Sequence, residues 1–400
     1  MKNPLVSIII PVYNGSNFMR EAIDSALAQT YPNIEILVVN DGSTDDTRAI
    51  ALSYGDKIRY FEKENGGVAT ALNLAIREMK GEYFSWLSHD DWYTPDKVEA
   101  EIAALRRCGD MTRAAYSACD FVQYPSGSGG KKNGLSFGKN FAETGWFAVA
   151  MGLISGCTLL IPKSYFDEFG GFDEQIRAAN DYEQWFKMFR DKRLAFVEKS
   201  LVGSRVHAKQ VTVTYAGMRE EEDRVWAWIM KGLQQVDITK SGITLQQVYR
   251  MALPRFFAAE GYPRTENVLL EYLRKTEGTE KAADPMQARS QERLMRASGC
   301  YVYCAGRFAR RLIRSLRWRG LFVRGVADSN PAKWGTMVEG IRCISPSEIP
   351  EDAKIIVANA CPGEIVAQLR ERGFEDVETS DDFAYDLLVT PVKEEYCGVV

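Results

Sequence analysis

Short apolar runs alternate, in the first part of the chain, with segments in which apolar side chains recur every three or four positions. The runs are rich in β-branched and aromatic residues, which is typical of strands buried on both faces. They occupy residues 5–10, 34–39, 58–61 and 84–87. The periodic segments between them predict helices that begin near residues 18, 47 and 66. This alternation predicts an α/β fold with a mixed, mostly parallel sheet covered on both faces.

Polar segments follow these strands, beginning near Pro11, Asp41 and Ser88. In a sheet of this kind the carboxyl ends of parallel strands share one edge, and ligands bind at that edge. We therefore expect the polar segments to converge on one site. Asp41 has a second interpretation, an Asx turn that caps the following helix, and both roles can hold at once.

Two adjacent carboxylates, Asp90 and Asp91, end the last of these strands. Carboxylate oxygens suit a hard divalent cation, which often shares its ligands with substrate phosphates. The alternative is a solvated turn before a helix, since Thr94 can cap that helix and Pro95 suits its first turn. Aspartate is a common turn residue, so these residues alone leave both interpretations open.

Further strands are predicted at residues 114–122 and 154–162, and small residues at the start of the second would let a ligand approach. The Gly-, Ser- and Lys-rich segment 125–134 indicates a hairpin connection or, alternatively, a flap that contacts an acceptor. Asn180 and Asp181 open a helix, where both residue types are favoured as caps. A carboxylate here could equally take a proton from an acceptor hydroxyl.

A charged helical pattern extends from residue 218 to about residue 296 and includes a polar linker at 276–288. A βα pattern restarts near residue 291. We therefore predict three parts: a catalytic domain, a helical subdomain with its linker, and a C-terminal α/β domain, at residues 1–215, 216–290 and 291–400.

Composition sets the class of protein. The 400 residues are 46% hydrophobic and carry a formal net charge of −4, which argues against nucleic-acid binding through bulk electrostatics. Eight cysteines show neither CxxC nor zinc-like spacing, which indicates a reducing compartment. No apolar run reaches membrane-spanning length. We expect a soluble, cytoplasmic protein with the inner face of the membrane as a further possible location.

Four segments, taken in order, resemble the motifs of glycosyltransferase family 2. They are VSIIIPVYN at residues 6–14, VNDGSTD at 39–45, ENGG at 64–67 and LSHDD at 87–91. This resemblance covers the first half of the chain and implies a GT-A fold. It also implies an enzyme that uses a nucleoside-diphosphate sugar as donor, with uridine diphosphate as the default nucleotide.

The resemblance assigns roles to individual residues. The implied donor-binding residues are Pro11, Tyr13, Asp41, Asn65 and Asp91. Asp90 is implied to coordinate a divalent cation, Mn²⁺ or Mg²⁺, that bridges the diphosphate. Asp181 stands at the position of the catalytic base.

The segment Arg205-Val206-His207 resembles the family's Arg-x-His after its last strand. His207, one of two histidines in the chain, would complete the metal site or touch the diphosphate. Arg205 would neutralise phosphate charge. The alternative is a structural, hydrogen-bonding histidine.

Three positions depart from the family pattern. Ser88 replaces the first aspartate of the Asp-x-Asp-Asp motif, which would weaken a nucleoside contact. Leu72 stands where many relatives carry arginine, and Asn180 stands where glutamate is usual, which removes a charge near the base.

The C-terminal domain resembles the Rossmann-type accessory domains of sugar-modifying enzymes. Its dinucleotide fingerprint is degraded, because Cys304 and Ala309 occupy glycine positions, although Asp328 ends the second strand where a ribose-binding acid is expected. A structural domain and a working nucleotide site both remain open. The arginine-rich helix at 307–317 is either a basic surface for anionic lipid or an ordinary solvated face.

These observations predict an inverting glycosyltransferase that moves a sugar to a hydroxyl of a glycan or lipid-linked glycan acceptor, in cell-surface polysaccharide synthesis. One alternative is an NAD-dependent sugar reductase or epimerase activity in residues 291–400. Another is a non-catalytic sugar-nucleotide-binding protein, prompted by Ser88 and Asn180.

Overall fold

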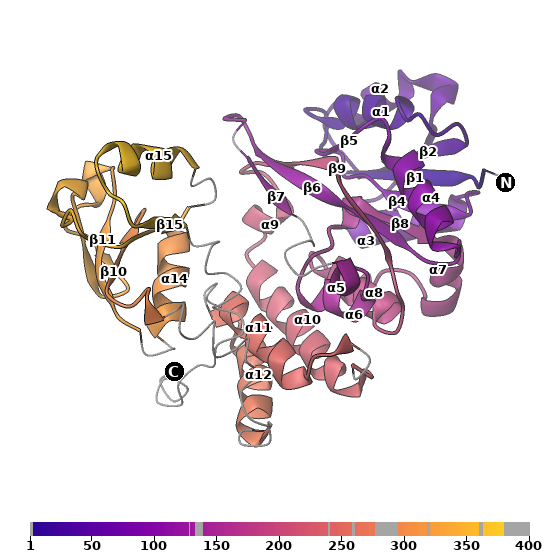
Figure 1. Ribbon diagram of the computed structural model, residues 1–400. Coiled ribbons are helices and arrows are strands. Elements are labelled where there is room, and N and C mark those ends of the chain that lie inside the picture. The colour runs from indigo at the N-terminus through magenta and orange to yellow at the C-terminus, as the bar shows by residue number, and fades with distance from the viewer. Residues whose placement is uncertain are drawn as a thin grey trace. The chain divides into compact units, whose positions relative to one another are not determined.

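A computed structural model describes residues 3–127, 129–132, 139–238, 241–257, 261–276, 295–317, 321–359 and 363–379. The chain forms two compact units, Met1–Val225 and Trp226–Val400, each with its own sheet (Figure 1). The predicted division into three parts stays a prediction. The polar linker predicted at 276–288 lies, apart from Thr276, outside the described residues.

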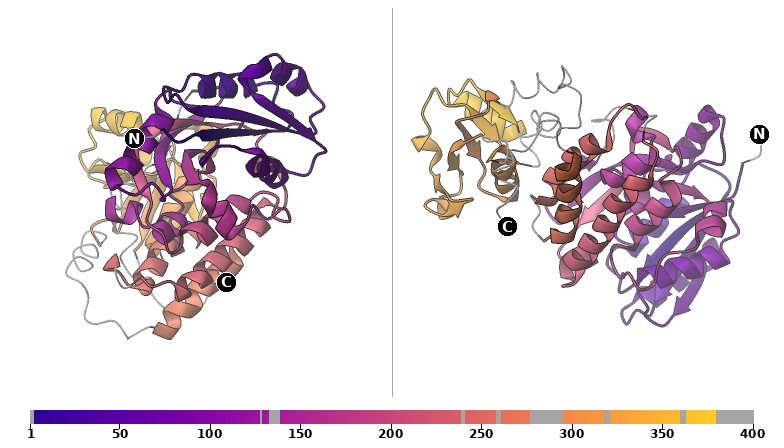
Figure 2. Two further views of the ribbon diagram at one scale, coloured as in Figure 1. Left: turned by 90° about the vertical axis from the view of Figure 1, so that its right-hand side faces the viewer. Right: turned by 90° about the horizontal axis from the view of Figure 1, so that it is seen from below.

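The sheet of the first unit begins with the parallel strands that the alternating pattern predicts. They lie in the order β3-β2-β1-β4, with bounds Arg59–Lys63, Ile34–Asp41, Val6–Val12 and Tyr83–Trp86. All seven residues of β1 are buried, as expected for a β-branched run covered on both faces. The connecting helices are α1 (Met19–Leu27), α2 (Thr47–Leu52) and α3 (Val68–Glu78). Figure 2 (left) shows helices on both sides of these indigo strands.

Beyond β4 the sheet becomes mixed. Its remaining strands follow in the order β8-β6-β9-β5, with bounds Leu159–Pro162, Ala115–Gln123, Ala195–Val206 and Trp92–Tyr93. Strand β8 runs antiparallel to β4 and β6, whereas β6 and β9 are parallel. The long pairing of β6 with β9 carries the chain back toward the β4–β5 loop, because β5 pairs with β9. The helices of this part are α4 (Lys97–Cys108), α5 (Lys139–Ala142), α6 (Gly145–Ala150), α7 (Lys163–Phe169), α8 (Asn180–Phe189), α9 (Val211–Thr214) and α10 (Met218–Gly232).

Two local expectations meet the structure differently. The strand predicted at 154–162 is shorter, because a 3-10 helix, Gly156–Thr158, precedes β8. A Cβ on Gly156 would lie 2.7 Å from the Trp86 ring, so the small residue accommodates that ring. The predicted hairpin connection is present in the described part of 125–134, where β7 (Gly129–Lys132) runs antiparallel to β6.

The second unit contains the helices α11 (Leu245–Phe257) and α12 (Pro263–Thr276) and a second sheet. Its described strands have the order β12-β13-β11-β10-β14-β15, parallel except for β12. Their bounds are Met337–Val338, Ile341–Ile344, Val323–Ala327, Cys300–Tyr303, Ile355–Val357 and Val377–Thr379. Helices α14 (Arg307–Arg317) and α15 (Gly363–Glu371) pack into two separate apolar clusters formed by alternate residues of these strands. Among the described residues, no helix is both long and apolar enough to cross a membrane.

Candidate functional site

A cavity of about 1080 Å³ opens in the first unit where the segments after β1, β2 and β4 meet. Parallel strands bring their carboxyl ends to one edge, which explains the convergence. Arg205 is not among the lining residues. Eight residues predicted for the site do line the cavity: Pro11, Tyr13, Asp41, Asn65, Asp90, Asp91, Asp181 and His207.

Asp41, at the end of β2, is 3% exposed and holds the start of α3. Its Oδ1 accepts hydrogen bonds from Lys63 Nζ at 2.6 Å and from the backbone N–H of Gly66 at 3.0 Å, and its Oδ2 accepts one from Gly67 at 2.8 Å. Gly67 has φ +91°, a left-handed conformation that favours glycine. Asp41 therefore holds the two glycines just before α3 and makes no such contact with the helix that follows it directly.

The start of the helix after β2 is held by Asp45 instead. Its carboxylate accepts the backbone N–H of Thr47 and that of Ser16, both at 3.0 Å, so it joins the loop after β2 to the loop after β1. Burial acts to raise the pKa of Asp45, but the hydrogen bonds from Thr47 and Ser16 outweigh it and lower the pKa to about 2. The charged carboxylate of Asp45 thus holds together two loops that form walls of the cavity.

Tyr13 and Asn65, both predicted to bind the donor, lie in the cavity wall. Tyr13 is 49% exposed, so its ring is free for stacking on a planar ligand. A Cβ on Gly42 would lie 2.7 Å from the backbone nitrogen of Asn65, so glycine allows this close approach. Leu72, the departure from the family's arginine, is fully buried in α3 and does not line the cavity.

Asp90 is 8% exposed and faces the cavity with two side chains from the segment after β9. Its Oδ2 lies 3.0 Å from Nε2 of His207 and 3.2 Å from Nε2 of Gln210. The Oε1 of Gln210 accepts the backbone N–H of His207 at 3.2 Å. The family resemblance connects the segment that contains His207 with Asp90, and the two do lie side by side.

Arg205, two residues before His207, is buried. Its guanidinium donates to the backbone oxygen of Asp90 at 2.5 Å and pairs with Glu21 at 2.7 Å. It also lies 4.3 Å from the ring centre of Phe18 and 5.0 Å from that of Trp92. This geometry fixes the backbone of Asp90, while the predicted phosphate contact stays a prediction.

Asp91 turns inward and is 5% exposed. Its Oδ1 accepts the backbone N–H of Arg205 at 2.8 Å, and its Oδ2 accepts hydrogen bonds from Cys157 Sγ at 3.3 Å and Ser204 Oγ at 3.4 Å. Burial, followed by the neighbouring charge of Asp90, raises the pKa of Asp91. Asp91 therefore ties the carboxylate loop to β9.

Ser88 also contacts this group of residues. Its backbone N–H and its hydroxyl lie 3.3 and 3.2 Å from Cys157 Sγ. Where the family has an aspartate, this chain therefore has a serine that packs on a buried thiol.

Asp181 is the second residue of α8, on the part of the wall formed by residues 177–181. Its Oδ1 accepts the backbone N–H of Tyr182 at 2.8 Å, and the Tyr182 hydroxyl donates to the backbone oxygen of Ile154 at 2.7 Å. Asn180 is 1% exposed, its amide donates to the backbone oxygen of Ile176, and it contributes to the same part of the wall.

Sequence reasoning missed two cations in the cavity wall, Arg177 and Lys209. Both are exposed, and within the part of the chain that the structure describes neither forms an ion pair. Arg177 lies 5.4 Å from the ring centre of Tyr215. The only signal was nearness in sequence, since Arg177 precedes Asp181 by four residues and Lys209 follows His207 by two.

The donor set at Asp90 fits part of a divalent-cation site. A carboxylate oxygen and an imidazole nitrogen 3.0 Å apart are both established metal ligands. No group of three His, Cys, Asp or Glu side chains that could hold a metal occurs among the described residues. A cation held here would need further oxygen ligands, which a substrate diphosphate offers.

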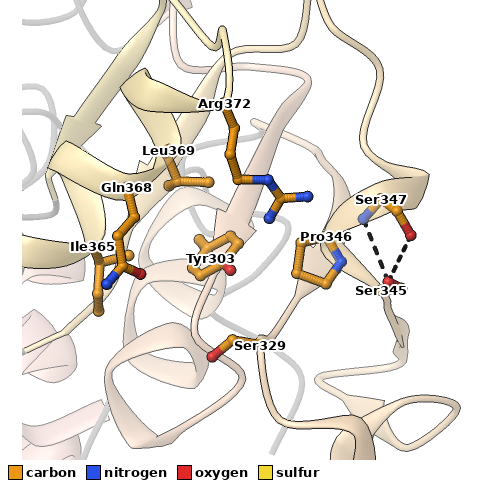
Figure 3. Close-up of a pocket in the computed structure, with 9 residues that line it drawn as sticks. All are labelled: Tyr303, Ser329, Ser345, Pro346, Ser347, Ile365, Gln368, Leu369 and Arg372. Atoms are coloured by element: carbon orange, nitrogen blue, oxygen red, sulfur yellow. Dashed lines mark hydrogen bonds between the residues drawn. The ribbon is translucent and has the colours of Figure 1, made fainter.

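A smaller cavity, of about 230 Å³, lies in the second unit. Figure 3 shows the guanidinium of Arg372 directed into it between Tyr303 and Pro346. Asp328, which stands where a ribose-binding acid is expected, does not line it, and neither does Cys304.

Known proteins resemble this chain in fold. The structure of residues 1–349 of TarS from S. aureus, in complex with UDP-GlcNAc, aligns with a TM-score of 0.53 at 18% identity. The alignment covers 72% of this chain and 85% of that one. The first unit has the GT-A fold.

Sequence comparison then gives the family. Residues 7–170 match the family described as "Glycosyl transferase family 2". The chain is 47% identical to an uncharacterised glycosyltransferase of Rickettsia typhi over 270 residues, which are 67% of this chain and 84% of the relative. It is 30% identical to the hyaluronan synthase of Pasteurella multocida over 221 residues, 54% of this chain and 22% of that enzyme. The chain belongs to glycosyltransferase family 2.

Proposed function

We propose that this protein is an inverting glycosyltransferase that moves a sugar from a nucleoside-diphosphate donor, UDP by default, to an acceptor hydroxyl. One observation carries the proposal: the Asp90–His207 pair and Asp181 line the same cavity as Tyr13 and Asp41. A single displacement needs a place for the diphosphate and a base for the acceptor, and this cavity offers both.

The donor end of the reaction uses the segments after β1, β2 and β4. Tyr13 and Asn65 would contact the nucleoside, with Pro11 and Asp41 shaping the wall. Asp90 and His207 would hold a Mn²⁺ or Mg²⁺ ion, which would stabilise the charge of the leaving diphosphate when bound. Arg177 and Lys209 add positive charge to the same cavity.

The acceptor end uses Asp181 as general base. Its carboxylate takes the proton of the acceptor hydroxyl while the acceptor oxygen bonds to the anomeric carbon. The bond from that carbon to the phosphate oxygen breaks, and its electron pair leaves with the nucleoside diphosphate. Attack from the face opposite the leaving group inverts the anomeric configuration, and no nucleophilic side chain is needed.

A glycan or lipid-linked glycan is the acceptor class we propose, with cell-surface polysaccharide synthesis in the cytoplasm at the inner face of the membrane as the setting. The similarity to part of a hyaluronan synthase, whose name denotes a polysaccharide, supports a glycan acceptor. Membrane contact through α14 has less support, because Arg314 forms two hydrogen bonds, at 2.8 and 2.9 Å, with Glu339.

The second unit is better described as structural than as a reductase or epimerase. The Asp328 carboxylate already accepts Ala305 N–H at 2.7 Å, Asn330 N–H at 2.8 Å and Lys333 Nζ at 2.8 Å. It thereby joins the turn after β10 to the end of β11. Cys304 has φ +78°, so the tight turn is kept although its glycine is not. A ribose would have to displace these partners of Asp328.

The test is release of nucleoside diphosphate from a panel of sugar nucleotides by the full chain, with and without acceptor glycans. We expect turnover with at least one donor and none after chelation of divalent cations. Donor binding without any turnover across the panel would favour the non-catalytic alternative. Bound nicotinamide seen by absorbance would favour the reductase alternative.

A further inference from the structure

A buried carboxylate lies directly behind the wall that carries Asp181. Glu221, in the first turn of α10, is 3% exposed and is not among the residues that line the cavity. It accepts three backbone N–H groups in a row: Arg177 to Oε2 at 2.9 Å, and Ala178 and Ala179 to Oε1 at 2.6 and 2.9 Å. A charge this deeply buried requires such partners, so the contact is specific.

Helix α8 has no cap of its own. Its N-cap residue, Ala179, provides no side-chain hydrogen bond, and the Asn180 amide donates to the backbone oxygen of Ile176. The first N–H groups of a helix need acceptors, and a negative charge is favourable at that end. Glu221, from another helix, accepts the N–H groups of the three residues just before Asn180, so it holds the segment that leads into α8 and brings a carboxylate to that end. In the family pattern a glutamate is usual at the position of Asn180.

We propose that Glu221 is a positioning residue for the transfer step. It fixes the strip 177–181, in which Arg177, Ala178, Asn180 and Asp181 all face the cavity, and so sets where the Asp181 carboxylate stands relative to the acceptor. The inference rests on the proposed function, because it needs Asp181 to be the base.

The reason to expect an effect on rate is geometric. A glutamine at this position keeps the shape but replaces one acceptor oxygen by an NH₂ group that faces backbone N–H donors. The strip must then shift to escape the unfavourable contact. A displacement of about 1 Å at a reacting group can cost on the order of a hundredfold in rate.

The experiment compares Glu221→Gln and Glu221→Asp with Glu222→Gln in the full chain. Glu222 is on the same turn of α10 and pairs with Arg219 at 3.2 Å, so it is a matched control. Each variant is checked for folding by circular dichroism and thermal melting. Donor affinity is then measured by calorimetry with UDP and Mn²⁺, and transfer by kcat and by KM for the acceptor.

We expect Glu221→Gln to lower kcat at least tenfold with UDP affinity within twofold of wild type, because the residues proposed to contact the nucleoside and the cation belong to other elements. Glu221→Asp should recover part of kcat, since it restores the carboxylate, and Glu222→Gln should match wild type. If the role of Glu221 is purely structural, its variants should have a lower melting temperature. Their kcat, measured well below that temperature, should then equal that of wild type.

Folded Glu221 variants with kcat within twofold of wild type would overturn the inference. If Glu221→Gln does not fold, an unchanged kcat in Glu221→Asp has the same meaning. Asp181→Asn, measured beside them, separates the two proposals: if it also transfers normally, the proposed base is wrong. If it is inactive while the Glu221 variants are active, only the positioning role fails.

Discussion

Each carboxylate of the cavity has a different set of donors and therefore a different task. Asp41 is occupied by Lys63 and two backbone N–H groups, and Asp91 by the backbone of Arg205. The side-chain partners of Asp90 are an imidazole and an amide that line the cavity with it. Asp90 is thus the carboxylate best placed to share a cation with a substrate.

At the same scale, the lowered pKa of Asp45 leads to a prediction about how stability depends on pH. Asp45→Ala removes the acceptor for Thr47 and Ser16, which should cost about 1 kcal/mol of stability, the usual scale for a lost cap. Because the folded pKa is lowered to about 2, the stabilisation is present above the ordinary pKa of an aspartate and is lost as pH falls toward 2.

Melting temperatures of wild type and Asp45→Ala, measured from pH 7 to pH 3, would show this. The difference between the two melting temperatures should be constant down to about pH 5 and should become smaller below it. A difference that widens on acidification would mean that the carboxylate does not hold the two loops in its charged form.

Residue types alone could not decide the role of Arg205. Its sequence position indicated a charge near phosphate, but its burial depends on Phe18 and Trp92, which come from distant parts of the chain. The same holds for Glu221, because its partners precede it by more than forty residues.

At the scale of elements, a buried ion pair supports the carboxylate loop. Lys97 and Glu101, one turn apart on α4, are fully buried and 2.8 Å apart. Lys97 also donates to Ser85 Oγ of β4 at 3.2 Å and lies 4.4 Å from the ring centre of Tyr93 in β5. The Tyr93 hydroxyl donates to Trp86 at 2.6 Å, so the network joins both ends of the segment that contains Asp90.

Breaking this pair should be strongly destabilising. Lys97→Met leaves Glu101 buried without its cation, which we expect to cost about 3–5 kcal/mol in urea unfolding. The double variant Lys97→Met, Glu101→Leu should recover most of that loss, because it removes both charges from the interior.

The exposed pair Lys275–Glu271 has the same spacing and is the control, and Lys275→Met should leave stability nearly unchanged because solvent screens an exposed pair. If Lys97→Met and the double variant are equally stable, the loss of stability comes from altered packing rather than from the unpaired charge of Glu101.

Element by element, the alternation of apolar runs predicts β1 to β4 and their helices because each is a local pattern. The alternation does not predict that β8 pairs antiparallel with β4 or that β9 pairs with β5. These pairings join residues far apart in sequence, and local periodicity does not encode them. They nevertheless complete the site, because β9 brings His207 to Asp90.

At the scale of the whole molecule, the two compact units suggest a division of labour. The residues that line the larger cavity all precede residue 217, and that unit has its own apolar core. The second sheet has separate clusters around α14 and α15. Independent cores allow one unit to be removed without opening the other.

A chain that ends at Thr276 keeps α11 and α12 but loses the second sheet with α14 and α15. It should therefore fold and still hydrolyse its donor sugar, and transfer to the acceptor is measured separately. Circular dichroism establishes folding, and release of nucleoside diphosphate measures activity. A folded truncation that binds no donor would mean that the second unit helps to build the site.

In the proposed function, Asp90 serves donor binding and Asp181 serves transfer in one cavity. The most direct measurement compares Asp90→Ala and Asp181→Asn by calorimetry with UDP, with and without Mn²⁺, and by sugar transfer. Asp181→Asn should bind UDP as wild type does and lose transfer by about a hundredfold or more, the scale of a general base. Asp90→Ala should lose the Mn²⁺-dependent part of UDP affinity. Tight UDP binding by Asp90→Ala that depends on Mn²⁺ as in wild type, or transfer by Asp181→Asn within twofold of wild type, would contradict the account.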